Sequence, residues 1–242
     1  MLRQSVKKIA AIAFSLGVLS FQTTQAQGAQ TVSTKVSPEE ATSKANAELE
    51  KKANEWVADM HLNDAAKEKT VSNAIAIHLI TVRDWNNEHP FTTVPAGINP
   101  ATGNKLSELD RQVIANSAIP PSVHENLMSV LRKELSPEQV EFILDKYTIG
   151  KVAFTLAGYK AIVPDLTSEE ETKIVGYLKE AREQAIDYKN MKQISAIFEI
   201  YKTKCEQYLN SNGRNWRQLF KAYVDKVKAQ KEADKQKQKT NQ

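Results

Sequence analysis

Apolar side chains recur at intervals of three and four residues along most of the chain, and they define five stripes. The first two stripes are Ala45, Leu49, Ala53, Trp56, Val57 and Met60, and then Val71, Ala74, Ile75, His78, Leu79, Val82 and Trp85. The last three are Ile174, Leu178, Ala181 and Ala185, then Ile194, Ile197, Phe198, Tyr201, Cys205, Tyr208 and Leu209, and finally Trp216, Leu219, Phe220, Tyr223, Val224 and Val227. This period predicts helices that bury one face. A turn at Asn212-Gly213 further predicts that Phe198, Trp216 and Phe220 share one core.

Helix starts are marked by a Ser or Thr that precedes Glu, Gln or Asp by three residues. The pattern occurs as Ser37…Glu40, Ser107…Asp110, Ser122…Glu125, Ser136…Gln139 and Thr167…Glu170. In each, the hydroxyl can accept a hydrogen bond from the third helical amide, while the second side chain accepts one from the amide of the cap. We therefore expect an all-α fold, a single domain of about 7–8 helices over residues 37–228. Shorter helices are expected at 107–117, 122–134 and 137–146.

Three segments depart from this pattern. Residues 89–105 contain three prolines and two glycines, and their hydroxyl and amide side chains favour an ordered loop of the kind that carries binding sites. Residues 151–163 alternate apolar and polar positions, which leaves a short β-hairpin as an alternative there. Beyond Lys228 the apolar spacing stops, so a disordered Lys/Gln-rich tail is expected at 229–242.

The first 26 residues have the pattern of a signal peptide. Three basic residues precede an apolar run at 9–21, and Thr24-Gln25-Ala26 indicates cleavage after Ala26, with Gly28, two residues beyond Ala26, as the alternative site. A helix of about 13 residues rises only ~20 Å, short of the ~30 Å hydrocarbon core, so no integral membrane span is expected. We expect residues 27–36 to be a flexible segment and the mature protein to be exported to the periplasm or the extracellular space.

The charge balance argues against a nucleic acid partner. The chain has 33 basic and 29 acidic residues, and three of the bases lie in the expected leader, so the remainder carries a net charge of +1. Residues 226–242 have six lysines against two acids, a local +4, which leaves 27–225 at −3. Nucleic acid binding needs basic residues gathered on a folded face rather than in a tail.

The histidines and the single cysteine are not spaced for metal or thiol chemistry. None of His61, His78, His89 and His124 forms an i,i+4 pair, so we predict neither a metal site nor a cofactor. His78 and Cys205 lie on apolar stripes, and both are interpreted as core residues. The chain also lacks a Gly-rich phosphate loop and a G-x-S-x-G motif.

Aromatic and amide side chains gather where the second predicted helix ends. Trp85 continues the apolar stripe of that helix, and Asn86, His89 and Phe91 follow it into the long loop. Sugars stack their apolar faces on aromatic rings and need partners for their hydroxyls, so this set favours one wall of a saccharide site. The alternatives are that Trp85 is an ordinary core residue and that His89 caps the helix.

Several charged side chains lie within two turns of one predicted helix. They are Glu180, Arg182, Glu183 and Asp187. Glu183 and Asp187 are four residues apart and share a helix face. Paired carboxylates are used in glycoside hydrolysis, although a solvated helix face shows the same spacing. A carbohydrate-active enzyme that uses Glu180 or Asp187 is therefore one alternative for the function.

Three runs in the C-terminal half carry a resemblance to a known family. They are Asp165-Leu166-Thr167-Ser168-Glu169-Glu170, Glu180-Ala181-Arg182-Glu183-Gln184-Ala185-Ile186-Asp187 and Ile197-Phe198-Glu199-Ile200-Tyr201-Lys202-Thr203-Lys204-Cys205-Glu206-Gln207-Tyr208-Leu209. Through them, residues 50–225 resemble a secreted Bacteroidetes family, domain of unknown function 3826. The resemblance implies sugar binding in the context of carbohydrate utilisation, without implying a mechanism. The chain departs from the family at Cys205-Glu206, where an Ile-Asn pair is expected.

A second resemblance is to periplasmic helical chaperones with Leu-Thr-x-x-Gln/Glu repeats. Residues 135–139 and 166–170 are similar to these repeats, although both are already explained as capping boxes. A chaperone-like or scaffolding protein is therefore the second function class.

Together these observations predict an exported helical protein that binds a saccharide or assists polysaccharide utilisation. A saccharide is the expected partner. The residues expected to contact it are Trp85, Asn86, His89, Phe91, Thr155, Tyr159, Arg182 and Asp187.

Overall fold

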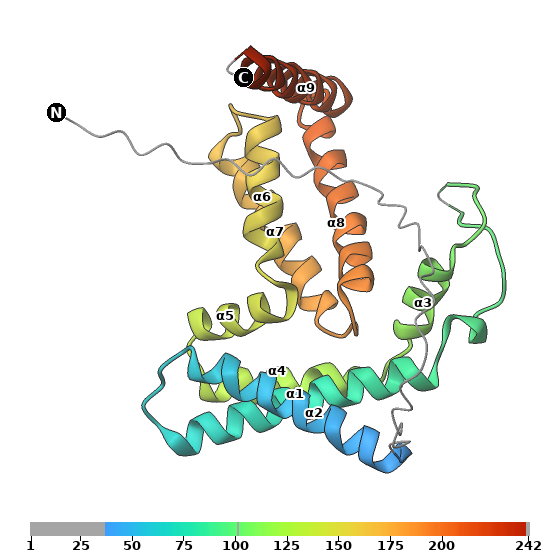
Figure 1. Ribbon diagram of the computed structural model, residues 1–242, viewed down its shortest axis with the longest axis vertical. Helices are drawn as coiled ribbons and strands as arrows, with labels where there is room; N and C mark the ends of the chain where they lie inside the picture. Colours follow the sequence, from blue (N-terminus) through green and yellow to red (C-terminus); the bar gives the residue numbers. More distant parts are fainter. Residues whose placement is uncertain (1–36, 101, 241–242) are drawn as a thin grey trace, which may run out of the picture. The chain divides into compact units, whose positions relative to one another are not determined.

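The computed structural model describes residues 37–100 and 102–240 of the chain, and these residues form nine α-helices and no named strand. The helices are α1 (Pro38–Ala58), α2 (Ala65–Glu88), α3 (Glu108–Asn116), α4 (Pro121–Glu134), α5 (Pro137–Thr148), α6 (Lys151–Ile162), α7 (Ser168–Ala185), α8 (Met191–Ser211) and α9 (Trp216–Thr240), with a 3-10 helix η1 (Phe91–Thr93) (Figure 1). The all-α, single-domain prediction is confirmed. The predicted signal peptide at 1–26 and the segment at 27–36 lie outside the described residues.

Local capping explains most of the helix starts. Ser107, Ser136 and Thr167 form complete capping boxes at α3, α5 and α7, as predicted. The predicted cap at Ser122 is wrong, because α4 begins one residue earlier with Pro121 at its first position. The pattern also missed two caps, Asp64 and Asn190, each of which accepts hydrogen bonds from two backbone amides. The predicted pattern began with Ser or Thr, so it excluded Asp and Asn caps, although Gln193 follows Asn190 by three residues.

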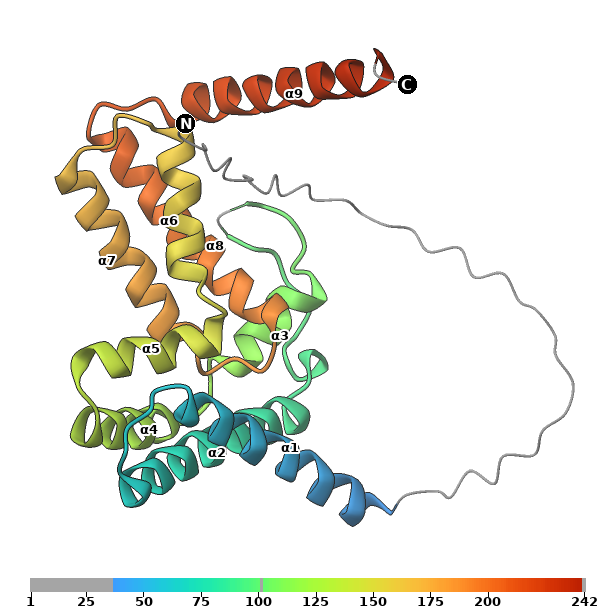
Figure 2. The same cartoon turned by 60° about the vertical axis from the view of Figure 1, so that its left-hand side comes forward.

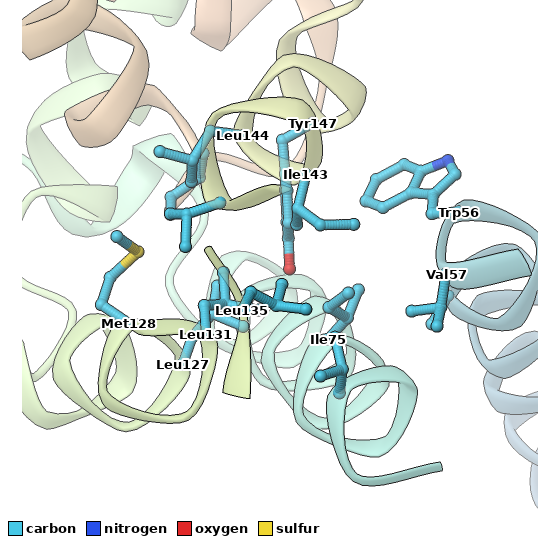
Figure 3. Packing of buried hydrophobic residues seen from close by; sticks show 14 of the residues in the cluster. Trp56, Val57, Ile75, Leu127, Met128, Leu131, Leu135, Ile143, Leu144 and Tyr147 are labelled. Atoms are coloured by element: carbon cyan, nitrogen blue, oxygen red, sulfur yellow. The ribbon is translucent and has the colours of Figure 1, made fainter. Parts of the chain in front are cut away.

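Helices α1, α2, α4 and α5 enclose the first of two hydrophobic clusters. Figure 3 shows Trp56 and Val57 of α1 directed at Ile75 of α2 and Tyr147 of α5. Leu131 of α4 and Ile143 of α5 are fully buried in the same cluster. Burial of one such side chain contributes about 1.5–3 kcal/mol, so this cluster fixes how the four helices meet.

Helices α6, α7 and α8 enclose the second cluster and lie side by side in Figures 1 and 2. The predicted stripe of α7, from Ile174 to Ala185, is fully buried, and so is Cys205 on α8. Phe198 is 1 % exposed and Trp216 packs against the cluster, as predicted. Phe220 is 47 % exposed, so its predicted place in that core is wrong. Helix α9 contacts α6 and α8, and Trp216, its first residue, packs against this cluster.

The hairpin considered for residues 151–163 is wrong, since Lys151–Ile162 form α6. Val152 and Tyr159 are seven residues apart, two helical turns, and both are buried against α7 and α8. The alternating pattern there arose because Phe154 is apolar yet 55 % exposed. Alanine, leucine and lysine elsewhere in the segment favour a helix, so propensity and packing agree.

The expected disorder of the tail is also not found in the described residues, where α9 continues to Thr240. The side chains described beyond residue 228 are exposed. Lys, Gln, Ala and Glu dominate this stretch and have high helix propensity, which accounts for a helical stretch whose described side chains are exposed. No helix in the described part of the chain has the length and apolar content to cross a bilayer.

The long loop between α2 and α3 is closed by backbone hydrogen bonds. After η1, Ile98 and Lys105 form an isolated antiparallel bridge, and the Leu106 amide donates to the Gly97 carbonyl at 2.9 Å. The Arg111 side chain of α3 donates to the Val94 carbonyl, with its Nε at 2.8 Å. The loop is thus tied to α3.

Candidate functional site

The side chain of Asp187, just after α7, binds residues of α2 and α4, and the network extends through α2 to α5. Its Oδ1 lies 2.9 Å from Nε2 of His78 on α2, and its Oδ2 lies 2.9 Å from Nδ1 of His124 on α4. The Tyr147 hydroxyl of α5 lies 3.1 Å from Nδ1 of His78. An ionised carboxylate only accepts hydrogen bonds, so both rings donate to Asp187. His78 then has its proton on Nε2, and Tyr147 donates to the unprotonated Nδ1.

This network keeps Asp187 ionised. Burial opposes the charge, but hydrogen bonds from His124 and His78 more than offset that effect, and the pKa of Asp187 is lowered. The hydrogen bond to Asp187 correspondingly raises the pKa of His124. Burial, together with the Asp187 charge, raises the pKa of Tyr147 well above its usual range. The network therefore favours the ionised form of Asp187 and the protonated form of His124.

The outer end of the network is half exposed. Nε2 of His124 lies 3.6 Å from Oε1 of Glu183, and the Arg132 guanidinium lies 2.8 Å from the same oxygen. His124 therefore stands between two carboxylates, one mostly buried and one open to solvent. This arrangement holds α4 against the end of α7.

The predicted wall at the end of α2 exists as a cluster, but its polar groups face protein. The Trp85 ring stacks on His89 at 3.7 Å between ring centroids. Nδ2 of Asn86 donates to Asn116 on α3 at 2.7 Å, and Asn116 donates to the Asp187 carbonyl at 3.4 Å. His89 is the C-cap of α2, as the alternative interpretation had it.

The remaining loop contacts complete this joint between α2 and α3. Gln112 of α3 donates to the His89 carbonyl at 2.9 Å, and the Arg111 guanidinium lies 5.3 Å from the centroid of the Phe91 ring. The structure thus brings Trp85, Asn86, His89 and Phe91 together beside α3 and connects them to Asp187.

The other predicted ligand residues lie elsewhere. Thr155 and Tyr159 are on α6, where the Tyr159 hydroxyl donates to the Lys202 carbonyl at 3.1 Å. Arg182 is 2 % exposed and forms ion pairs of 2.7 Å with Glu141 and Asp145 of α5. Arg182 and Asp187 are close in sequence but bind different neighbours.

The carboxylates considered for hydrolysis also have different neighbours. Glu180 lines a groove of about 660 Å³ on α7 and α8, beside Tyr177 and Tyr208. Asp187 has both oxygens engaged by His78 and His124. A general acid must hold a proton, and the environment of Asp187 favours its ionised form.

A cavity of about 580 Å³ lies where α1, α5 and the start of α8 meet. Its lining residues are Lys52, Trp56, Leu79, Phe142, Asp145, Lys146, Tyr147, Ile149, Gly150, Lys189, Asn190, Met191 and Ile194. Aromatic rings and lysine side chains thus occur together in one concave site, as small-ligand sites require.

Core contacts fix the aromatic part of this cavity. Trp56 meets Tyr147 edge to face at 4.9 Å between ring centroids, and Figure 3 shows the two side chains next to each other. The Lys52 ammonium lies 4.9 Å from the Trp56 ring centroid, and Lys146 lies at the same distance from Phe142. Tyr147 also belongs to the Asp187 network, so the cavity wall and the buried network share one side chain.

The sequence contains a signal for this cavity that the prediction missed. Lys52 and Trp56 are four residues apart on α1, and Phe142 and Lys146 are four apart on α5. Such i,i+4 pairs place a cation beside a ring on one helix face. The pairs do not predict the cavity itself, because the cavity forms where α1 and α5 approach the start of α8, through contacts between residues far apart in the sequence. Among the described residues, no group of three or more His, Cys, Asp or Glu side chains could hold a metal ion.

The comparisons with known proteins identify a family but no characterised relative. No curated protein matches the chain. The sequence profile of one family, described as protein of unknown function (DUF3826), matches residues 46–229. The match spans most of the chain and includes all the residues that line the cavity and form the Asp187 network. The chain belongs to the protein family of unknown function DUF3826.

Proposed function

We propose that this protein binds a saccharide in the cavity formed by α1, α5 and the start of α8. The observation that carries the proposal is the pair of rings, Trp56 and Phe142, lining one cavity together with several lysine side chains. Sugar rings present C–H faces that pack on aromatic surfaces, while their hydroxyls need charged or polar partners. The cavity volume of about 580 Å³ falls within the range of about 300–1,000 Å³ typical of small-ligand sites.

The family resemblance supports the same proposal, because it implies sugar binding in carbohydrate utilisation. An exported location, expected from the N-terminal pattern, would bring the protein to extracellular or periplasmic glycans. The site differs from the one predicted at Trp85 and the 89–105 loop. Those side chains are engaged with α3, whereas Phe142 is only partly buried and lines the cavity with Trp56, which is 9 % exposed.

Two other function classes have less support. A hydrolase using Asp187 would need a proton or a free oxygen there, and His78 and His124 occupy both oxygens. A chaperone-like protein would need an extended apolar groove, and on the described part of α9 the large hydrophobic side chain found exposed is that of Phe220.

Thermal stabilisation across a glycan panel tests saccharide binding. A ligand at 100 times its dissociation constant adds about 2.7 kcal/mol to stability, which shifts the melting temperature measurably. Phe142→Ala should weaken binding of any active glycan by about tenfold, because one stacking surface is lost. Phe154→Ala removes an exposed ring from α6, outside the cavity, and serves as the matched control.

Two results would contradict the proposal. One is a panel in which no glycan stabilises the protein. The other is a binding glycan whose affinity is the same in the Phe142 variant as in the parent.

A further inference from the structure

The lysines of the cavity suggest which saccharides it selects. We infer that the cavity takes an anionic saccharide, one that carries a carboxylate or a sulfate, and that Lys52 and Lys189 recognise the charged group. This inference rests on the proposed function and adds the chemical class of the ligand.

The cavity has a local excess of positive charge. Three ammonium groups line it, those of Lys52, Lys146 and Lys189, against one carboxylate, that of Asp145. Residues 27–225 carry a net charge of −3, so this excess does not reflect a basic body. A cavity that gathers cations on a faintly acidic protein favours an anionic ligand.

The negative charge of Asp145, the acidic residue of the cavity lining, is offset by the buried Arg182. Asp145 pairs at 2.7 Å with the buried Arg182 guanidinium, which also binds Glu141. Arg182 therefore offsets part of the carboxylate charge that would otherwise repel an anion in the cavity. Lys146 pairs at 2.6 Å with Asp59, which lies outside the lining.

The other two lysines have no carboxylate within ion-pair distance in the described part of the chain. Lys189 donates to the amide oxygen of Asn87, and the Lys52 ammonium lies over the Trp56 ring. Burial lowers the pKa of Lys52, although the residue as a whole is exposed. An ammonium next to an aromatic ring matches an acidic sugar, whose charged group meets the cation.

Matched pairs of glycans test the inference by calorimetry on the whole protein. The probes are uronic acid oligosaccharides with their methyl esters, and sulfated galactan oligosaccharides with their desulfated forms. We expect at least one charged member to bind about tenfold or more tightly than its neutral counterpart, as expected for a charge-assisted hydrogen bond. The uronic acid and sulfate series show which anion is preferred.

Two lysine variants locate the recognition. Lys52→Gln and Lys189→Gln should each lower the affinity for the charged glycan about tenfold and leave that of its neutral form unchanged. Lys51→Gln, a neighbour whose side chain is 78 % exposed and which lies outside the cavity lining, is the control. Equal melting temperatures of the variants would show that all three are folded.

The outcomes separate this inference from the proposed function. If neutral glycans bind as tightly as charged ones, the ligand class is wrong although saccharide binding stands. If a charged glycan binds but neither lysine variant weakens it, recognition by Lys52 and Lys189 is wrong. If no glycan binds, both proposals fail.

Discussion

The Tyr147 hydroxyl lies 3.1 Å from Nδ1 of His78, so a ring in the cavity wall is tied to the buried carboxylate of Asp187. In this network, the state of each side chain depends on the hydrogen bond that it makes with its neighbour. Tyr147 fixes the His78 tautomer, and His78 with His124 keeps Asp187 ionised. The network links α2, α4, α5 and the end of α7 behind the cavity, and it therefore holds the wall in place.

Removing the Tyr147 hydroxyl should destabilise the protein. Tyr147→Phe leaves Nδ1 of the buried His78 without its donor, and an unsatisfied buried group costs about 1–3 kcal/mol. Urea unfolding followed by circular dichroism measures the change. Tyr177→Phe is the control, because that ring packs on Tyr208 at the α7–α8 surface, and it should change stability by less than about 0.5 kcal/mol. Equal effects of the two substitutions would contradict the role given to the hydroxyl.

The network should also make stability depend on pH in two directions. The pKa of His124 is raised on folding, so its contribution is fully present below the ordinary value of 6.5 and is lost as pH rises through the higher folded value. The pKa of Asp187 is lowered, so its contribution is present above 3.8 and is lost as pH falls through the folded value. The network therefore stabilises most in the mildly acidic range between these two values.

Unfolding free energies of the parent and of His124→Gln test this expectation. The parent should lose stability from pH 6 to pH 9 by more than the variant does, because the variant has no proton to release at this position. Identical slopes for the two proteins in this range would show that His124 has the same proton affinity in the folded and unfolded states.

Features that depend on residues close together in the sequence could be predicted, and features that depend on residues far apart in the sequence could not. Capping boxes such as Thr167…Glu170 lie within four residues and were predicted correctly, as was the buried stripe of α7. Asp187 was singled out for its spacing from Glu183, but its partners His78 and His124 are 109 and 63 residues away. No local period encodes such a pairing.

The cavity was missed for the same reason. Trp56, Phe142 and Met191 line it from three helices, and each residue is unexceptional in its own segment. The cluster at Trp85 was predicted, since its members are adjacent in sequence, but what it faces was not. Whether a polar side chain meets solvent or α3 depends on the tertiary packing that places Asn116 opposite Asn86.

Two phenylalanines predicted to share one core should respond differently to substitution. Phe198 is 1 % exposed in the second cluster, so Phe198→Ala should destabilise the protein by about 3–5 kcal/mol. Phe220 is 47 % exposed on α9, so Phe220→Ala should cost less than about 1 kcal/mol. Chemical denaturation of both variants gives the comparison. A large effect at Phe220 would mean that α9 is covered in solution.

The buried guanidinium of Arg182 should matter for stability and for ligand binding. Arg182→Met keeps most of the side-chain volume but leaves Glu141 and Asp145 without their shared cation. These carboxylates are 40 % and 42 % exposed, so water can partly replace the ion pairs, and we expect a loss of about 1–3 kcal/mol rather than the larger cost of a fully buried pair. The uncompensated Asp145 charge at the cavity should weaken an anionic glycan further.

Lys179→Met is the matched control for this prediction. Lys179 pairs with Glu141 from the surface, with its side chain 48 % exposed, so its loss should cost at most about 1 kcal/mol. It does not touch Asp145 and should leave glycan affinity unchanged. Urea unfolding and calorimetry with a charged glycan measure the two effects separately. If Arg182→Met lowers stability but leaves the affinity for the charged glycan equal to that of the Lys179 variant, then the Asp145 charge does not act on the ligand, and Arg182 serves only to join α7 to α5.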